Sequence, residues 1–372
     1  EKILGTKTVL LDELGNKMIQ IESKIKGNFR LKGYLVRTEH GVPLTMLCGG
    51  NEVFFDATNP DARTYVWEKI KKNYYDQGAK LFWLDVAEPE YSVYDFKNYR
   101  YQLGSVQEVG NIYPKYYLKA FYDGMTAEGD TMPISLIRSA WAGSAKYGAL
   151  VWSGDIVSTF ECFRRQVQAG LNMAIAGIPW WTTDIGGFHG ARTDDPDFHR
   201  LYIRWFEYGC FCPVMRLHGN RNPQEGYGAE QIGSGSDNEI WSFGDKAYEI
   251  SKKYIFLRER LRDYIRTQMK KAHEDGTPMM RPVFYDFPTD QESWNVEDAY
   301  LFGPDLYVAP VMEDHVTERE VYLPDGTAWF NAWTGEKYEG GQNVTVAAPL
   351  DTIPVFVKEG ADAEKLLNIF SE

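Results

Sequence analysis

The sequence predicts an α/β fold, a (β/α)8 TIM barrel followed by a small antiparallel β-sandwich domain. Three observations carry this prediction. Short apolar runs alternate with helical patterns up to about residue 276, as is typical of a parallel sheet. Several of these runs end in a charged residue, and the carboxyl ends of barrel strands form the catalytic face. From residue 277 onward, short β-runs divided by turns favour an antiparallel sandwich. The predicted domains are therefore 1–276 and 277–372.

The stretch that organises the barrel lies at residues 80–90. The apolar run Leu81-Phe82-Trp83-Leu84 indicates a strand buried on both faces, and Asp85 closes it. A carboxylate at that end of a barrel strand indicates a catalytic role rather than a role in packing. An aspartate that merely caps the next loop remains the alternative.

The other elements follow in alternation. Asn59 and Asp195 each precede a proline, which predicts the start of two helices by the N-cap and first-turn preferences of these residues. Six strands can be counted where a closed barrel requires eight, so either two are misread or two lie upstream. A doubly wound open sheet competes, but it would collect its site at one switch point. Strands are expected at 16–22, 80–85, 132–138, 148–155, 173–181 and 213–218, helices at 60–77, 115–128, 160–171, 197–208 and 239–272, a glycine-rich loop at 226–235, and later β-runs at 307–311, 319–323, 329–330, 343–346 and 353–357.

Composition excludes some classes of protein. The net charge of -13 and the scattered basic residues argue against a nucleic-acid partner. No apolar run approaches the roughly 20 residues of a membrane helix, and the first residues lack a secretory signal. The chain does not begin with Met, so an upstream segment is expected. The four cysteines, which lack metal-site spacing, are interpreted as reduced structural thiols in a cytoplasmic protein: Cys48, Cys162, Cys210 and Cys212.

Two of the predicted strands end in carboxylates that suit glycoside hydrolysis. Asp85 and Asp155 follow strands separated by one intervening strand, so in a barrel both side chains lean over one pocket. Paired carboxylates serve there as nucleophile or base and as acid. A separation of about 5 to 5.5 Å permits a covalent intermediate with retention, whereas roughly 6.5 to 9.5 Å gives inversion. The sequence leaves this distance open.

Four ordered motifs of the barrel resemble those of glycoside hydrolase family 31, which contains retaining α-glucosidases and α-xylosidases. Two later stretches, 302–311 and 333–335, resemble the β-domain that follows the family's barrel. The resemblance implies that strands 3 to 8 of the barrel are present and that the first two strands, with an amino-terminal β-sandwich, are lacking, so that the chain is a carboxyl-terminal portion. The barrel motifs are Trp83-Leu84-Asp85-Val86-Ala87-Glu88-Pro89, Arg138-Ser139-Ala140-Trp141-Ala142-Gly143, Trp152-Ser153-Gly154-Asp155 and Asp184-Ile185-Gly186-Gly187-Phe188.

The resemblance also implies residue roles. Asp85 matches the nucleophile and Asp155 the general acid/base, which must hold a proton through burial or a nearby negative charge. Arg138 matches an arginine beside the nucleophile, although an ordinary strand-end salt bridge is its alternative. Glu88 is expected to fix its loop rather than react. Asp184 and His218 match residues that bind sugar hydroxyls. Three tryptophans are candidates for the wall of the pocket, although a role in core packing is an equal alternative for each of them: Trp83, Trp152 and Trp181.

The predicted function is a retaining exo-acting α-glycoside hydrolase, an α-xylosidase or α-glucosidase that works without a cofactor or metal on an oligosaccharide or small α-glycoside. One alternative is a transglycosidase. Another is a catalytically incomplete portion that needs a missing amino-terminal half or a partner chain, and a homo-oligomer also stays open. A metal-dependent hydrolase is the third, although its candidate ligands match no standard spacing: Asp184, His189, His199 and His218.

Overall fold

The computed structural model describes residues 9–11, 17–22, 24–25, 33–47, 51–225 and 234–371. Its chain divides into two compact units, Glu1–Trp152 and Ser153–Glu372, and each unit is described by itself. No described helix combines the length and the apolar character that crossing a membrane requires.

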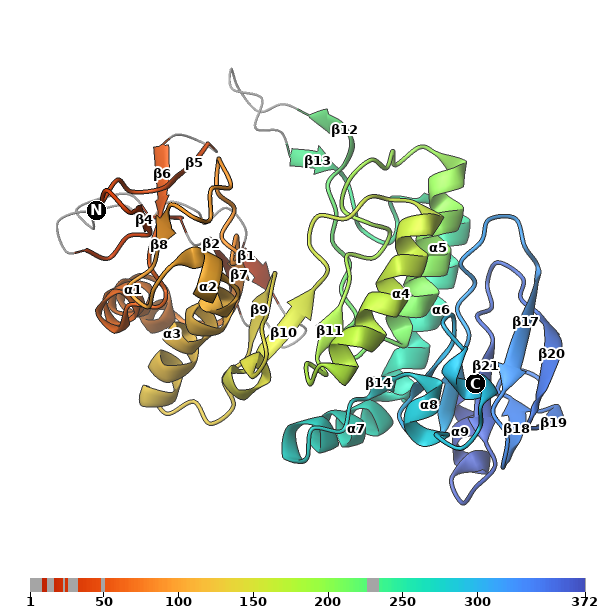
Figure 1. The fold of residues 1–372 in the computed structure, drawn as a ribbon. Coiled ribbons are helices and arrows are strands. Elements are labelled where there is room, and N and C mark those ends of the chain that lie inside the picture. The colour runs from red at the N-terminus through yellow and green to blue at the C-terminus, as the bar shows by residue number, and fades with distance from the viewer. Residues whose placement is uncertain are drawn as a thin grey trace. The chain divides into compact units, whose positions relative to one another are not determined.

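A parallel sheet forms the centre of the first unit (Figure 1). Its strands run in the order β2 (Lys17–Glu22), β7 (Ala79–Asp85), β9 (Ser135–Ile137) and β10 (Ala149–Trp152), each parallel to its neighbour. Strand β1 (Val9–Leu11) pairs antiparallel with β2. These bounds confirm the strands predicted at 16–22 and 80–85, the central part of the one at 132–138, and the first part of the one at 148–155.

Two helices pack beside this sheet, α1 (Pro60–Asn73) and α3 (Tyr113–Ala127). Helix α1 begins where the sequence predicts, because the Asn59 side chain accepts hydrogen bonds from the amides of Asp61 at 2.9 Å and Ala62 at 3.3 Å. Gly124 allows α3 to approach α1, since a Cβ there would lie 2.1 Å from the Trp67 ring. The first unit's short elements are β3 (Lys24–Ile25), β4 (Arg37–Thr38), β5 (Thr45–Leu47), β6 (Asn51–Phe54), β8 (Tyr99–Arg100), α2 (Val106–Val109) and the 3-10 helices η2 (Tyr75–Gln77), η3 (Gly110–Ile112) and η4 (Ser144–Tyr147).

The second unit begins with long helices that run side by side in Figure 1. Thr159 caps α4 (Phe160–Ile175), and Asp195 caps α5 (Pro196–Cys210) as the sequence predicts. In each case the side-chain oxygen accepts a hydrogen bond from a backbone amide in the first turn of the helix. From Leu201 to Cys210 every residue of α5 is buried, so this helix forms the unit's core. The elements are α4 (Phe160–Ile175), β11 (Trp181–Thr182), α5 (Pro196–Cys210), the hairpin β12 (Arg221–Glu225) and β13 (Ser234–Ser236), α6 (Gly244–Arg260) and α7 (Arg262–Glu274). Residues 226–233 of the predicted glycine-rich loop lie outside the described part of the chain.

Two strand predictions in this unit are wrong in whole or in part. Residues 213–218 form no strand: Val214 donates to the Trp181 carbonyl at 3.2 Å and Ile185 donates to the Arg216 carbonyl at 3.4 Å, but these isolated bonds do not continue as a ladder. In the run at 173–181, the first residues belong to α4 and only Trp181 is strand. Apolar periodicity does not distinguish a buried extended segment from a strand, and this ambiguity explains both errors.

Two of the cysteines lie at the end of α5. Cys210 is the last residue of α5, Cys212 follows in the turn, and burial raises the pKa of both thiols to about 12. These two and Cys162 carry no disulfide, and Cys48 lies outside the described residues.

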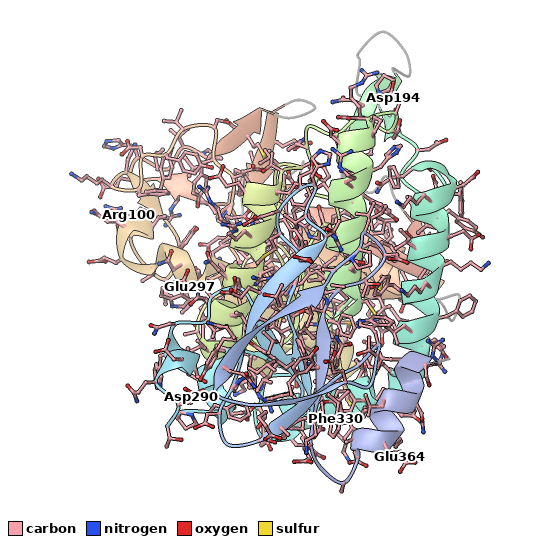
Figure 2. The ribbon with its side chains drawn as sticks, turned by 90° about the vertical axis from the view of Figure 1, so that its right-hand side faces the viewer. Arg100, Asp194, Asp290, Glu297, Phe330 and Glu364 are labelled. Carbon is pink, nitrogen blue, oxygen red and sulfur yellow. The ribbon has the colours of Figure 1, made fainter. Side chains whose placement is uncertain are left out.

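The rest of the second unit consists of antiparallel sheets, as predicted. One sheet has the order β14-β15-β16-β21-β18-β19, and β17 pairs with β20. Their inner faces enclose a core around Trp329, Phe356 and Leu323, and Figure 2 shows Phe330 on β18 and Glu364 on α9. The elements are β14 (Met280–Arg281), α8 (Val283–Asp286), η5 (Glu292–Trp294), β15 (Tyr300–Phe302), β16 (Leu306–Val308), β17 (Glu318–Leu323), β18 (Ala328–Asn331), β19 (Lys337–Glu339), β20 (Gln342–Ala347), β21 (Val355–Lys358) and α9 (Ala363–Ser371). The domain boundary predicted at residue 276 falls between α7 and β14 and stays a prediction.

Arg204, which forms a buried ion pair with Glu207 within α5, also joins this helix to the segment that follows β20. Arg204 contacts Glu207 at 3.1 Å and donates to backbone carbonyls that include Ala348 at 2.7 Å and Pro349 at 3.0 Å. Burial raises the pKa of Glu207 to about 8, against the lowering effect of Arg204 and of the Tyr254 hydroxyl. Because its donors reach several carbonyls, Arg204 fixes the position of the carboxyl-terminal sheets on the helix.

Candidate active site

Asp85 is the last residue of β7, and a sharp change of direction follows it. Its Oδ1 accepts a hydrogen bond from the Val86 amide at 2.8 Å, and its side chain is 15% exposed. Val86 has a φ of 55°, a left-handed value that is strained for a β-branched residue. The chain therefore turns away from the strand at once and leaves the carboxylate at the strand's end.

Arg138 brings three carboxylates together beside this strand end. The register of β7 and β9 pairs Leu84 with Ile137, so Arg138 lies next to Asp85, with Nε 3.4 Å from Asp85 Oδ1. Its guanidinium donates two bonds of 2.8 Å to Glu88 and contacts Glu90 at 3.0 Å. Burial lowers the pKa of Arg138, but the hydrogen bonds and charges of Glu88 and the charge of Asp85 raise it further, to a net value above its usual range. This cluster thus holds negative charge beside a fixed cation.

The first two candidate tryptophans lie under this cluster. The rings of Trp83 and Trp152 meet edge to face with centroids 5.7 Å apart, and both pack with Leu136 in a buried apolar cluster. Trp181, in the second unit, packs against Gly170 of α4, where a Cβ would lie 2.7 Å from Nε1. These are core contacts, and the predicted role in the wall of a sugar pocket stays a prediction.

Asp155 opens the second unit, three residues after the end of β10. Gly154 has a φ of 78°, so the turn before Asp155 uses the left-handed region that glycine favours. The exposed Asp155 is followed by Ile156, whose carbonyl accepts from the Phe188 amide at 2.7 Å and the His189 amide at 2.9 Å. The loop that carries Asp155 is thereby tied to the loop that follows Asp184.

A second cluster of charged and polar groups contains Asp184, which is fully buried, and His218, which is partly buried. Asp184 is fully buried, Oδ1 accepts from Arg216, and Oδ2 has no hydrogen-bond partner among the described residues. Burial raises the pKa of Asp184 to about 7, with Arg216 opposing the shift and the negative charge of Asp155 adding to it. Burial, helped by Arg216 and Arg221, lowers the pKa of His218 to about 3, so its imidazole is neutral near pH 7. The neutral His218 imidazole and the Asp184–Arg216 pair therefore supply hydrogen-bonding groups to this cluster.

Arg221 connects the loops around Asp155 and Asp184. Its guanidinium is fully buried and donates to the carbonyls of Gly187 at 2.6 Å and Ile185 at 3.0 Å, to Ser158 Oγ at 3.4 Å and to Asn238 Oδ1 at 2.8 Å. Gly219 makes room for it, because a Cβ there would lie 2.4 Å from the guanidinium carbon. Burial lowers the pKa of Arg221 to about 10, against the raising effect of Asp184. Arg221 therefore positions backbone rather than pairing with one carboxylate.

Sequence reasoning missed three residues of these clusters: Glu90, Arg216 and Arg221. Glu90 directly follows the first quoted motif, and Arg216 and Arg221 lie two residues before and three residues after His218, so a second charge close to a candidate residue was the available signal. The candidate metal ligands do not assemble: among the residues that the structure describes, no group of three or more His, Cys, Asp or Glu side chains is arranged to hold a metal ion. His199, for example, contacts the Thr193 carbonyl through Nε2 at 2.6 Å.

A parallel sheet in which β7 ends in a carboxylate is typical of the catalytic face of a (β/α) barrel. Comparison with known proteins gives the family. Residues 13–268 match the glycosyl hydrolases family 31 TIM-barrel domain, and residues 276–361 match the family's C-terminal domain. The chain belongs to glycosyl hydrolase family 31. This confirms the predicted TIM barrel followed by a domain of antiparallel sheets.

Several relatives are named as α-xylosidases. The crystal structure of a family 31 α-xylosidase from a soil metagenome complexed with xylose is 55% identical, with a TM-score of 0.92, and the match covers 95% of this chain and 54% of that one. An α-xylosidase of Saccharolobus solfataricus is 36% identical over 312 residues, 82% of this chain and 41% of the relative. Alpha-xylosidase A of Aspergillus niger is 35% identical over 370 residues, 87% of this chain and 49% of the relative. The chain thus spans about half the length of these relatives.

Proposed function

We propose that this chain is the catalytic portion of a retaining α-glycosidase in which Asp85 is the nucleophile and Asp155 the general acid/base. The observation that carries the proposal is the cluster at the end of β7, where Arg138 lies 3.4 Å from Asp85 and is itself bound to Glu88. A cation fixed beside a carboxylate stabilises its negative charge before attack and orients its oxygens. The family membership of the chain supports the same assignment.

In the first step, Asp85 Oδ attacks the anomeric carbon of the substrate. The bond from that carbon to the leaving oxygen breaks, and Asp155 delivers its proton to this oxygen. In the second step, Asp155 takes a proton from water as the water oxygen attacks the same carbon and releases Asp85. Two inversions give net retention. Asp184 and His218 are placed in this proposal as groups that bind the hydroxyls of the terminal sugar.

An α-xyloside is the substrate that we propose first, because the soil metagenome relative that is 55% identical is an α-xylosidase complexed with xylose. An α-glucoside is the alternative, and an α-glucosidase of Bacillus thermoamyloliquefaciens that is 33% identical supports it. A transglycosidase differs only in the second step, where a sugar hydroxyl replaces water. The transglycosidase alternative is supported by a relative that is 32% identical, an isomaltosyltransferase of Sporosarcina globispora.

A second candidate function is a catalytic portion that needs another chain segment or partner to complete its sugar pocket. The coverage of the relatives favours it, since the chain matches 41% of one α-xylosidase and 49% of another. Specificity between xylose and glucose depends on the space for one hydroxymethyl group, so a pocket wall supplied from elsewhere would set it. The cytoplasmic location stays a prediction from the sequence.

The test is a leaving-group series on the purified chain. Wild type is assayed with nitrophenyl α-xyloside and α-glucoside, and proton NMR follows the anomer released first, which is expected to be α. Asp155→Ala should retain kcat/KM for substrates with acidic leaving groups and lose kcat/KM for alkyl glycosides, because kcat/KM reports the first step and only the alkyl glycosides need a proton donor there. Asp194→Ala, a change of another exposed aspartate of the second unit (Figure 2), is the matched control. Equal loss for all leaving groups would overturn the role of Asp155, and a complete absence of turnover in wild type would favour the incomplete portion.

A further inference from the structure

A cavity of about 570 Å³ lies in the first unit, beside the loop that follows Asp85. One side is aromatic, formed by Tyr91, Tyr94 and Phe96, and the rim is polar, with Glu88, Gln107 and Asn111. This volume is in the range of small-molecule sites, which combine apolar walls with a few polar groups that fix orientation. The roles proposed above for Asp85 and Arg138 do not involve the aromatic side.

The aromatic side of the cavity is open to solvent. Tyr94 is 61% exposed and Phe96 45% exposed, and their rings meet edge to face with centroids 5.6 Å apart. Below them lies Tyr91, which is 5% exposed and contacts the two rings at centroid distances of 6.2 and 6.5 Å. Exposed aromatic rings that are grouped and supported from beneath are typical of a contact site rather than of a random surface.

The loop that carries these rings is anchored at both ends, so the site is preformed. Ser92 Oγ donates to the Thr45 carbonyl at 2.6 Å, and the hydroxyls of Tyr91 and Tyr101 lie 2.8 Å apart. The Tyr99 hydroxyl donates a further hydrogen bond to the Val93 carbonyl, within the same loop. Arg100, labelled in Figure 2, donates to the Lys97 carbonyl at 2.9 Å and pairs with Glu39. Binding to a fixed surface costs less ordering entropy than binding to a loose loop.

The charges around the cavity favour a neutral occupant. Of the charged residues that line it, Glu88 is already bound by Arg138, and Asp95 and Lys97 offset each other. A phosphate or a carboxylate would find no excess of positive charge here. A pyranose ring matches both surfaces, because its axial C–H face packs on an aromatic ring while its hydroxyls meet amide and carboxylate groups at the rim.

The position of the cavity indicates which sugar it takes. Glu88 lines the cavity and is also bound by the arginine that lies beside Asp85, so the cavity adjoins the candidate nucleophile. An exo-acting enzyme removes a terminal sugar, which must lie over the nucleophile. The neighbouring space is then filled by what remains attached to the leaving oxygen.

We propose that Tyr94 and Phe96 form a binding platform for a pyranose ring of the leaving group, the part of the substrate beyond the bond that is cleaved. This inference rests on the proposed function for its place in the reaction, but binding at the platform does not require turnover. The partner is therefore a glycoside whose leaving group is itself a sugar or oligosaccharide.

The test measures binding and turnover separately. Saturation-transfer NMR with a β-1,4-linked glucose tetrasaccharide, which an α-glycosidase does not cleave, reports binding to the purified chain. Tyr94→Ala and Phe96→Ala should each weaken this binding about fivefold, as loss of one aromatic contact predicts. Phe256→Ala removes a phenylalanine that is 55% exposed on α6 and should leave binding unchanged. Thermal unfolding by circular dichroism checks that all variants fold.

Turnover gives the second measurement. For an α-linked xylosyl or glucosyl oligosaccharide, the platform variants should raise KM with kcat nearly constant. For α-xylosyl fluoride, which has no sugar beyond the cleaved bond, they should change neither parameter. Tetrasaccharide binding that is absent, or present but equal in all variants, overturns the platform. Binding that depends on Tyr94 and Phe96 without any turnover supports the platform and counts against the proposed function alone.

Discussion

Arg138 and Arg221 show the same side chain used in opposite ways in the two units. The Arg138 guanidinium contacts three carboxylates, those of Asp85, Glu88 and Glu90, and these neighbours raise its pKa above the usual range against the lowering effect of burial. Arg221 is fully buried, its side-chain hydrogen bonds to the described residues all go to neutral oxygens, and burial lowers its pKa to about 10. The first arrangement fixes negative charge at a strand end, whereas the second fixes two loops in place. We therefore expect Arg138 to matter for rate and Arg221 for stability.

Replacing Arg138 should give the largest effect on activity. Arg138→Met removes the cation beside Asp85, and kcat/KM is expected to fall on the order of 10²- to 10³-fold, as for loss of one preorganised electrostatic partner. Arg138→Lys should recover only part of this rate, because an ammonium cannot make the two parallel bonds to Glu88. Steady-state kinetics measure the loss.

Arg164→Met serves as the control for Arg138, since Arg164 is an exposed arginine paired with Glu313 in the second unit. A fall of less than threefold in Arg138→Met, with the fold intact, would contradict the role assigned to the cluster.

Replacing Arg221 should give the largest effect on stability. Arg221→Met leaves two buried carbonyls without donors, and the free energy of unfolding is expected to fall by about 3 kcal/mol. Denaturant unfolding followed by circular dichroism measures it. Arg192→Met, a change of an exposed arginine paired with Asp194, should cost less than about 0.5 kcal/mol. Comparable losses in both variants would mean that the buried network does not hold the loops.

In the second unit, the buried Asp184 should make the stability of the protein depend on pH near neutrality. Because the pKa of Asp184 is raised to about 7, its contribution to stability is present below its unfolded pKa near 3.8 and is lost as pH rises through 7. Asp184→Asn removes this titration. The difference in unfolding free energy between wild type and variant should therefore change by about 1.4 kcal/mol from pH 6 to pH 8.5.

Glu207, whose pKa is raised to about 8, titrates in both proteins and cancels from this difference. A pH-independent difference would show that Asp184 stays ionised throughout this range.

The smallest expected effect separates the two glutamates that Arg138 binds. Glu88 makes two bonds of 2.8 Å with Arg138, whereas Glu90 makes one contact of 3.0 Å. Glu88→Gln should lower kcat/KM by about tenfold and Glu90→Gln by no more than about threefold, since only the first is bidentate. The reverse order would show that Glu90, which the sequence did not single out, is the main partner of Arg138.

Local signals in the sequence predicted the elements that local chemistry determines. Asn59 and Asp195, each before a proline, marked two helix starts, and the apolar run ending at Asp85 marked β7. The segment at 213–218 was predicted as a strand because its composition matches one, but strand pairing depends on a neighbour that the sequence does not specify.

The same limit applies to the clusters. The sequence predicted that Arg138 lies near Asp85 through a family resemblance, and the register of β7 and β9 gives the physical reason. It did not predict the contact of Arg216 with Asp184, 32 residues away, or the bonds of Arg221 to Ile185 and Gly187. Such contacts arise from the packing of loops against one another, and they leave only an isolated charge in the sequence.

The most direct test of the account is to trap the covalent intermediate. The purified chain is incubated with a fluorinated α-xylosyl fluoride, whose fluorine slows hydrolysis of the glycosyl-enzyme, then digested and analysed by peptide mass spectrometry. We predict one fluoroxylosyl group, attached to Asp85, and no label in Asp85→Ala. A label on another carboxylate, or inversion with no labelled peptide in an active preparation, would contradict the assignment of Asp85 as the nucleophile.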